Sequence, residues 1–278
     1  PSVEEPMKRL AEQGFEIIRL PTDETGRIRE EDLFEAVNRE TILVSLMYVN
    51  NEVGSIQPVQ AARAAVEKAG APAYIHCDAV QAFGKLPVNP KELGVDLISV
   101  SAHKIHGPKG VGALYVKKGI RLTPYLLGGG QESGIRSGTQ AMPAIVGFGT
   151  AAAAIGNPRR HCAEVKVLRD ALTERLKALG GVEFNSAPEA LPFVLNISFP
   201  GIPSEVLRNF LSEKGVYVST GSACAKGHRS PVLTAMQLPP QQIDSAVRIS
   251  FSRFNTMEET NYLYDCLAEA KETLRKRN

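Results

Sequence analysis

Hydrophobic residues in the first half of the chain follow two alternating spacings. Short apolar runs rich in β-branched residues are typical of strands, whereas apolar positions that recur every three or four residues are typical of helices. Strands are predicted at residues 15–20, 41–49, 73–77, 97–101 and 112–116, and helices at 3–14, 30–38 and 58–69. The run at 41–49 is apolar nearly throughout, as a buried strand of a parallel sheet requires. The pattern predicts an α/β fold with a mostly parallel sheet sandwiched by helices.

The second half changes character after a helix rich in alanine and glycine. That helix is predicted at 142–155, and the breaker sequence Gly156-Asn157-Pro158 follows it. Further helices are predicted at 164–179, 203–213 and 257–276, and strands at 194–199, 216–219 and 247–251. This mixture indicates a smaller C-terminal α+β domain. We therefore expect a large domain at 1–157 and a small domain at 158–278.

Composition narrows the class of protein. The chain has 278 residues, of which 43% are hydrophobic and 22% charged, the balance of a globular protein. Its 32 basic and 30 acidic residues leave a net charge of +2, so no strong field favours nucleic acid or an anionic membrane. The one basic cluster, at Lys271, Arg275, Lys276 and Arg277, is interpreted as a helix end that complements the helix dipole.

The number of cysteines and the length of the apolar runs indicate in which cellular compartment the protein is expected. Four cysteines in so long a chain do not make a disulfide scaffold. The apolar run at 42–49 is too short to span a bilayer, and Ser45 interrupts it. The opening residues do not resemble a signal peptide. A cytoplasmic, reducing location without a membrane is the expectation.

Polar residues follow three of the predicted strands. Asn50-Asn51-Glu52 follows 41–49, Asp78 and Gln81 follow 73–77, and Ser101, His103 and Lys104 follow 97–101. Each alone has an ordinary reading, since Asp after a strand is commonly a helix cap and Lys a solvated charge. The carboxyl ends of parallel strands meet at one edge of a sheet, where ligands bind. The sequence therefore predicts a polar site at that edge.

Pyridoxal phosphate (PLP) chemistry uses this set of side chains. A lysine forms a Schiff base with the aldehyde, and an aspartate keeps the pyridine nitrogen protonated, so that the ring withdraws electrons. Serine, histidine and backbone N–H groups suit the phosphate. No His/Cys cluster has the spacing of a zinc site, and His106 and His161 have no partner in the pattern. PLP is thus the predicted cofactor, with no metal.

Five ordered motifs resemble the cysteine desulfurases, which are class V, fold-type I PLP enzymes. They are YVNNEVG at 48–54, HCDAVQ at 76–81, SVSAHKIHGPKG at 99–110, GGGQESGIRSGT at 128–139 and STGSAC at 219–224. The resemblance runs from about residue 15 to about residue 255. It implies a fold-type I PLP-transferase fold, in which 1–157 is the PLP-binding large domain and 158–278 carries the nucleophile loop.

The resemblance also implies a role for each matching residue. The catalytic residues would be Lys104, Cys224 and His103, with Lys104 holding the aldehyde of PLP. The remaining cofactor-binding residues would be Asp78 on the pyridine nitrogen, Gln81 on the ring oxygen, Asn51 on the ring, Ser101 and His103 on the phosphate, and Thr139 on the phosphate of the other subunit of a homodimer. Arg248 and Asn51 would bind the substrate, and an arginine does grip a planar carboxylate with two donors.

Cys224 matches the nucleophile of this family. It would take the sulfur of L-cysteine as a persulfide, release L-alanine and pass the sulfur to an acceptor, such as a scaffold for iron–sulfur cluster assembly or a tRNA-thiolation enzyme. Nearby Lys226, His228 and Arg229 would favour the thiolate. The remaining cysteines, at 77, 162 and 266, are interpreted as structural.

Two departures from the family pattern bear on activity. The family has an N-terminal stretch, with a phosphate-binding turn and a histidine that stacks on PLP, before the point where this chain begins. The chain is therefore expected to be a truncated form with impaired PLP binding. The loop from Cys224 to Leu233 spans ten residues and is shorter than in well-known sulfur donors, which leaves the acceptor open.

Other functions stay open from the residues alone. Selenocysteine lyase, cysteine/cystine lyase and class V aminotransferase share the fold, although Cys224 in its motif disfavours the aminotransferase. An alternative of another class is a non-catalytic dimeric scaffold that binds sulfur-transfer partners. The combination of Lys104, Asp78, Gln81 and Cys224 disfavours that alternative.

Overall fold

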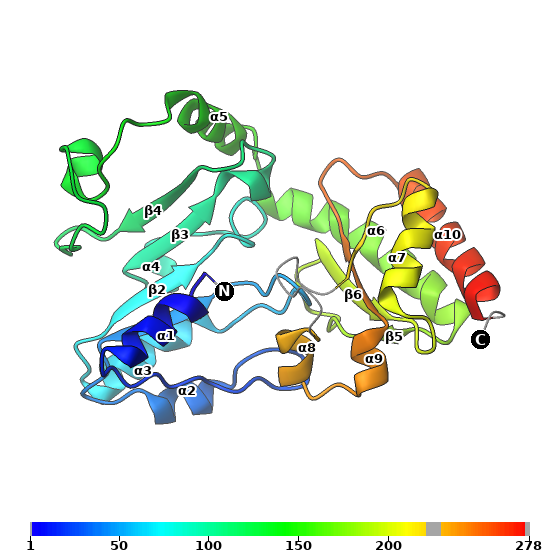
Figure 1. Cartoon of the computed structure of the whole chain (residues 1–278), viewed down its shortest axis with the longest axis horizontal. Coiled ribbons are helices and arrows are strands. Elements are labelled where there is room, and N and C mark those ends of the chain that lie inside the picture. Colours follow the sequence, from blue (N-terminus) through cyan, green and yellow to red (C-terminus); the bar gives the residue numbers. More distant parts are fainter. Residues whose placement is uncertain (1, 221–228, 276–278) are drawn as a thin grey trace. The chain divides into compact units, whose positions relative to one another are not determined.

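Four strands of the first half of the chain pair into one sheet in the computed structural model, which describes residues 2–220 and 229–275 (Figure 1). They are β1 (Leu43–Met47), β2 (Tyr74–Asp78), β3 (Leu97–Ser101) and β4 (Gly112–Val116), in that order across the sheet. β1, β2 and β3 run parallel, and β4 is antiparallel to β3. This confirms the predicted α/β fold with a mostly parallel sheet.

The sheet belongs to one of two compact units. This parallel-sheet unit comprises Arg39–Val49 and Val59–Arg160, and its helices are α3 (Val59–Ala69), α4 (Pro90–Leu93), η1 (Ala102–Ile105), η2 (Gln131–Gly134) and α5 (Met142–Ala153). One face of the sheet carries Val44, Ile75, Cys77 and Ile98, which are all buried, and α3 packs against β1 and β2. That face is the core of the unit.

The opposite face of the sheet is more polar and more open than the sequence predicts. Leu43, Tyr74 and Leu114 lie on it and are 38–48% exposed. The prediction that 41–49 is buried on both faces is therefore wrong for β1. Only Val44 of β1 is buried, and the other four residues of the strand are exposed or half-buried.

Asp96 directly precedes β3, at the end of that strand opposite its carboxyl end. Its carboxylate accepts hydrogen bonds from Ile75 N at 3.0 Å, Arg63 Nη2 at 2.7 Å and Lys117 Nζ at 3.1 Å. These donors belong to β2, to α3 and to the residue that follows β4. Asp96 thereby ties three elements together where β3 begins.

The second unit is built on an antiparallel sheet. This antiparallel-sheet unit comprises Pro1–Asn38, Asn50–Pro58 and His161–Asn278. Its strands are β5 (Glu183–Phe184), β6 (Val194–Ser198), β8 (Ala246–Ser250) and β7 (Ser219–Thr220), in that order. Its helices are α1 (Glu4–Glu12), α2 (Glu30–Ala36), α7 (Ser204–Glu213), α8 (Pro231–Ala235), α9 (Pro240–Asp244), α10 (Met257–Arg275) and most of α6 (Pro158–Leu179). Every residue of β6 is buried, so this strand is the centre of the core.

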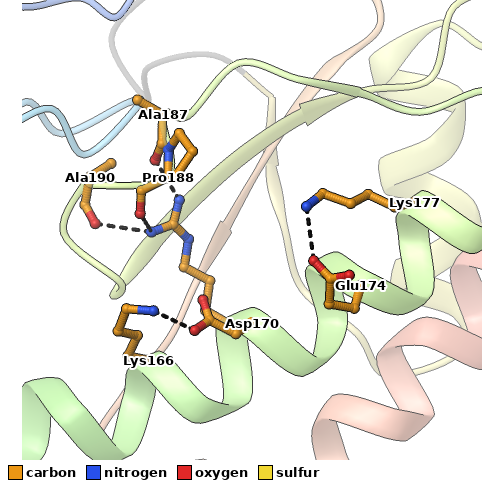
Figure 2. Close-up of polar contacts among 8 residues, drawn as sticks. Lys166, Asp170, Glu174, Lys177, Ala187, Pro188 and Ala190 are labelled. Carbon is orange, nitrogen blue, oxygen red and sulfur yellow. Dashed lines mark hydrogen bonds and ion pairs between the residues drawn. The ribbon is translucent and has the colours of Figure 1, made fainter.

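Arg169 of α6 shows how a buried cation is accommodated in this core. It is 4% exposed and donates to the carbonyl oxygens of Ala187, Pro188 and Ala190 at 2.7–3.2 Å. Figure 2 shows this loop above the helix, whose outer face carries the ion pairs Lys166–Asp170 and Lys177–Glu174. Burial lowers the pKa of the Arg169 guanidinium, and the three carbonyl dipoles replace its lost hydration.

Most predicted elements are present with shifted ends, but two predictions fail. Residues 15–20 form no strand, because Phe15 and Ile18 are 45% and 52% exposed and no strand of the described chain pairs with them. The strand predicted at 216–219 is reduced to Ser219–Thr220. The domain division at 157/158 stays a prediction, and the antiparallel-sheet unit also contains residues 1–38 and 50–58. Among the helices of the described residues, none has the length and hydropathy needed to cross a bilayer.

Candidate active site

The predicted polar edge exists in the parallel-sheet unit. Asp78 is the last residue of β2 and Ser101 is the last residue of β3, and these two strands are parallel neighbours. Gln81 follows β2 within a turn, and η1 places His103 and Lys104 directly after β3. The structure therefore brings five predicted residues to the carboxyl ends of adjacent strands.

The backbone around Asp78 fixes the position of its carboxylate. Asp78 Oδ1 accepts a hydrogen bond from Val80 N at 3.0 Å, and the Asp78 carbonyl accepts one from Tyr48 N at 2.8 Å. Gln81 is 7% exposed, and its Oε1 accepts from Lys85 Nζ at 3.4 Å. Asp78 is thus held by its own turn, and a carboxylate is a chemically suitable partner for a cationic nitrogen.

Ser101 and His103 form a hydrogen-bonded pair at the carboxyl end of β3. Their side chains lie 2.7 Å apart, between Ser101 Oγ and His103 Nδ1. Burial lowers the pKa of His103, and the charges of Lys104 and Lys109 lower it further. The same two lysines give this edge positive charge. An imidazole, a hydroxyl and nearby lysines suit a phosphate group.

His76 is a feature of this edge that the sequence pattern did not reveal. Its Nδ1 lies 2.8 Å from Ser45 Oγ, and its Nε2 lies 2.8 Å from Ser99 Oγ, so one imidazole joins β1, β2 and β3. Burial lowers the pKa of His76, and the nearby Asp78 charge opposes that shift. The alternation of residues along β2 places His76 and Asp78 on one face, which is the only signal that the sequence offers.

Asn51 and Arg248 are brought together in the antiparallel-sheet unit. Arg248 of β8 donates from Nη1 to the Asn51 carbonyl at 3.0 Å and from Nη2 to Ser219 Oγ at 3.2 Å. Its Nε is buried and has no partner among the described residues. Burial lowers the pKa of Arg248, and the negative charge of Glu52 opposes that shift. This guanidinium is held in place and can bind a carboxylate.

The remaining predicted residues are Thr139 and the four cysteines. Thr139 is exposed and ends a segment in which Ser137 Oγ donates to the Gly129 carbonyl at 2.7 Å, and its contact with a second subunit stays a prediction. Cys224 lies outside the described residues. Cys77 and Cys266 are buried and Cys162 is half-buried, and burial raises the pKa of Cys77 to about 12. The burial of Cys77 and Cys266 is consistent with the expected structural role, which stays a prediction for all three thiols.

The residues at the polar edge fit PLP by their chemistry. The edge supplies a primary amine at Lys104, a carboxylate at Asp78 and hydroxyl and imidazole groups at Ser101 and His103. An aldehyde, a pyridine nitrogen and a phosphate require these three kinds of group. Among the described residues there is no cluster of three or more His, Cys, Asp or Glu side chains suited to a metal.

Comparison with known proteins shows which family the chain resembles and which proteins are similar to it. Residues 1–263 match the family described as aminotransferase class V. The cysteine desulfurase IscS of Dictyoglomus turgidum is 39% identical over 279 residues, which cover 99% of this chain and 70% of that protein. The cysteine desulfurase IscS of Methanosarcina thermophila is 39% identical over 96% of this chain and 66% of its own length.

Solved structures give a similar result. A NifS-like protein superposes with a TM-score of 0.90 at 40% identity, covering 97% of this chain and 72% of its own. The apo structure of a cysteine desulfurase from Thermococcus onnurineus NA1 has a TM-score of 0.85 at 23% identity, covering 96% of this chain and 69% of its own, and supports the fold. The architecture and the motif residues therefore point to the same group of proteins.

Proposed function

This chain belongs to the class V aminotransferase family, together with cysteine desulfurases, and from that premise we propose that it removes the sulfur of L-cysteine. The C–S bond of cysteine and the S–H bond of Cys224 break, an S–S bond forms on Cys224, and the β-carbon takes up the proton to give L-alanine. The Cys224 thiol becomes a persulfide, so atoms and electrons balance without an external oxidant. PLP, when bound, supplies the electron-withdrawing ring that weakens the C–S bond.

The observation that carries the proposal is the edge formed by β2, β3 and η1. Lys104 would hold the aldehyde of PLP, and Asp78 would face the ring nitrogen. Gln81 would bond the ring oxygen, and Ser101 with His103 would hold the phosphate. The bonds of Asp78 Oδ1 to Val80 N and of Ser101 Oγ to His103 Nδ1 support these roles, because they fix both groups before a ligand binds.

Substrate recognition is proposed for the Arg248 guanidinium and for Asn51. Arg248 is already oriented by the Asn51 carbonyl and by Ser219, so little side-chain freedom remains to be lost when a carboxylate binds. Thr139 is proposed to reach the phosphate in a second subunit of a homodimer. We also propose that the persulfide passes to an acceptor protein in the cytoplasm.

The test is an absorbance spectrum of the purified chain after incubation with PLP and removal of the free cofactor. A visible band that is lost in Lys104→Ala supports the cofactor site, and a band that persists in Lys104→Ala refutes the assignment of Lys104. Cys224→Ala should keep the band but lose alanine and sulfide release. Retained turnover in Cys224→Ala would instead indicate a lyase or an aminotransferase, which do not need this thiol.

A further inference from the structure

Asn196 is a fully buried amide with no role in the proposed function. It lies at the centre of β6, where every residue is buried, and none of its own surface is exposed. Its neighbours along the strand, Leu195 and Ile197, are apolar and equally buried. A side-chain amide in such a core costs free energy unless its donor and acceptor groups are bonded. An apolar residue would avoid this cost, so the partners of the amide indicate why it is here.

A network of bonds fixes the direction of the Asn196 amide. Its Oδ1 accepts a hydrogen bond from Asn185 Nδ2 at 2.7 Å. Asn185 is held in turn, because its Oδ1 accepts from Gln242 Nε2 at 2.6 Å. With the oxygen of the Asn196 amide bonded on that side, its Nδ2 donates to the Glu52 carbonyl at 3.1 Å. The network therefore directs one N–H group of β6 to the turn at residues 50–53.

The same turn also holds Arg248. Arg248 Nη1 donates to the Asn51 carbonyl at 3.0 Å. The next carbonyl along the chain is that of Glu52, which accepts from Asn196. Two successive carbonyl groups of one turn are therefore bonded by two residues of one sheet, Asn196 of β6 and Arg248 of β8.

Asn196 and Arg248 are also direct neighbours in that sheet. β6 and β8 are antiparallel, and their register places Asn196 opposite Arg248. Residues opposite each other on adjacent strands have their side chains on the same face. On the other side of β8, Arg248 lies opposite Ser219 of β7, whose Oγ accepts from Arg248 Nη2 at 3.2 Å. Ser219 thus bonds one terminal nitrogen of Arg248 directly, and Asn196 bonds the turn that holds the other.

The position of the guanidinium depends on the position of this turn. An arginine side chain has many rotamers, and a carboxylate binds it more tightly when few of them remain to be lost. A backbone carbonyl restricts the guanidinium only if the peptide that carries it is itself fixed. Asn196 supplies such a fixed point, because its donor comes from the most buried strand of the antiparallel-sheet unit. Without that donor, the Asn51 carbonyl would hold Arg248 less firmly.

We propose that Asn196 is a positioning residue for substrate recognition: it fixes the turn at residues 50–53, and through that turn it orients the Arg248 guanidinium for the carboxylate of the amino-acid substrate. The inference rests on the proposed function, in which Arg248 binds that carboxylate. Loss of the amide should weaken substrate binding and leave the chemical step unchanged. An amide that serves only the core would lower stability without any effect on Arg248.

Two variants remove the amide, and a third is the control. Asn196→Ala deletes it, and Asn196→Leu replaces it by an apolar side chain of similar shape, which keeps the test open if the alanine variant does not fold. Ser198→Ala is the matched control, because Ser198 is fully buried in the same strand and its Oγ accepts from Asn185 Nδ2 at 2.8 Å. In the part of the chain that the structure describes, Ser198 has no hydrogen bond to the turn. Arg248→Ala, alone and combined with Asn196→Ala, completes a double-mutant cycle.

The first measurement is the KM and kcat for L-cysteine, with the PLP content and melting temperature of each variant. Asn196→Ala should raise KM about fivefold with kcat nearly unchanged, the size expected for the loss of one hydrogen bond. In the Arg248→Ala background, the same substitution should raise KM no further, because the residue through which it acts is gone. Ser198→Ala should melt at a lower temperature but keep both constants.

The second measurement needs neither PLP nor turnover. The buried Nε–H group of Arg248 gives an NMR signal in isotope-labelled protein, and its loss in Arg248→Ala assigns it. The signal should be sharp in wild type and in Ser198→Ala. It should broaden or shift in Asn196→Ala and Asn196→Leu, because the guanidinium is then less restricted.

Three results would overturn the inference. The first is a wild-type KM in both Asn196 variants. The second is a further fivefold rise in KM when Asn196→Ala is added to Arg248→Ala, since the amide would then act independently of Arg248. The third is an unchanged Arg248 Nε–H signal in both Asn196 variants. If the wild-type chain releases no sulfide from L-cysteine, the proposed function fails, and the NMR signal alone decides the inference: a broadened signal in the Asn196 variants supports it, and an unchanged signal refutes it.

Discussion

When Asp96 is replaced by alanine, the parallel-sheet unit should unfold at a markedly lower denaturant concentration. Asp96 is 4% exposed, and its carboxylate accepts from Arg63, from Lys117 and from the amide of the fully buried Ile75. Loss of the Arg63 contact costs about 2 kcal/mol for a hydrogen bond between charged groups, and the orphaned Ile75 N–H adds about 1–2 kcal/mol. The exposed Lys117 adds less than about 1 kcal/mol.

The sum is about 4 kcal/mol, within the range for breaking a buried ion pair. Urea unfolding followed by circular dichroism measures it, and a slope of about 2 kcal/mol per M converts it into a midpoint about 2 M lower. Lys117→Ala is the matched control, expected to move the midpoint by less than about 0.5 M. A loss below about 1 kcal/mol for Asp96→Ala would refute the assignment of Asp96 as the brace of this sheet.

The pH dependence gives a second test of the same residue. Burial alone would raise the pKa of Asp96, but the Ile75 amide, Lys117 and Arg63 together hold it below its ordinary value. A lowered folded-state pKa stabilises the protein above the ordinary aspartate pKa, and this contribution disappears as the pH falls through the folded value. The stability gap between wild type and Asp96→Asn should therefore narrow in acid. A gap independent of pH would contradict this reasoning.

Three further predictions concern other residues. Gly54→Ala should lose about 2 kcal/mol of stability by urea unfolding, because φ is +77° and a Cβ would lie 3.2 Å from both the Leu191 carbonyl and Val194 Cβ. Gly14→Ala is the control, because φ is +93° but the space around it is open, and it should lose about half as much. Equal losses in the two variants would contradict the steric argument. Cys77 should resist iodoacetamide at pH 8 in the folded protein and react only in urea, because burial raises its pKa to about 12. Mass spectrometry measures the labelling of each cysteine, and labelling of Cys77 at the rate of Cys162 would contradict this prediction. Arg169→Lys should melt nearly as low as Arg169→Ala, since one ammonium cannot replace donors to three carbonyls; a lysine variant as stable as wild type would show that the charge alone suffices.

Much of the parallel-sheet unit was predictable because its signals are local. β3 and β4 have the predicted bounds, since each is a compact apolar run between turn residues. Phe15 and Ile18 lie in a run of similar appearance that forms no strand. A strand depends on hydrogen bonds to a neighbour, and the spacing of residues within the run contains no information about that neighbour.

In the candidate site, too, the residues with local signals were predictable, and the contacts between distant segments were not. Asp78, Ser101 and Lys104 were found because strand ends of a parallel sheet converge, which is a rule about position in the chain. Asn51 also follows a strand, but its carbonyl pairs with Arg248, which lies 197 positions later. The turn is closed by Asn50 Oδ1 and held by Asn196 of β6, a partner that no local spacing in the sequence reveals.

Glu52 and His76 show why a buried polar residue is hard to interpret from sequence. Each looks ordinary in its own segment, one in a turn and the other in a strand. Their contacts come from Ser230 and from the serine pair at 45 and 99, which are hydroxyl groups with no distinctive spacing. The cost of burying such groups means that they persist only where partners are placed for them. The spacing within a segment therefore does not identify such residues, because their partners come from segments far away in the sequence.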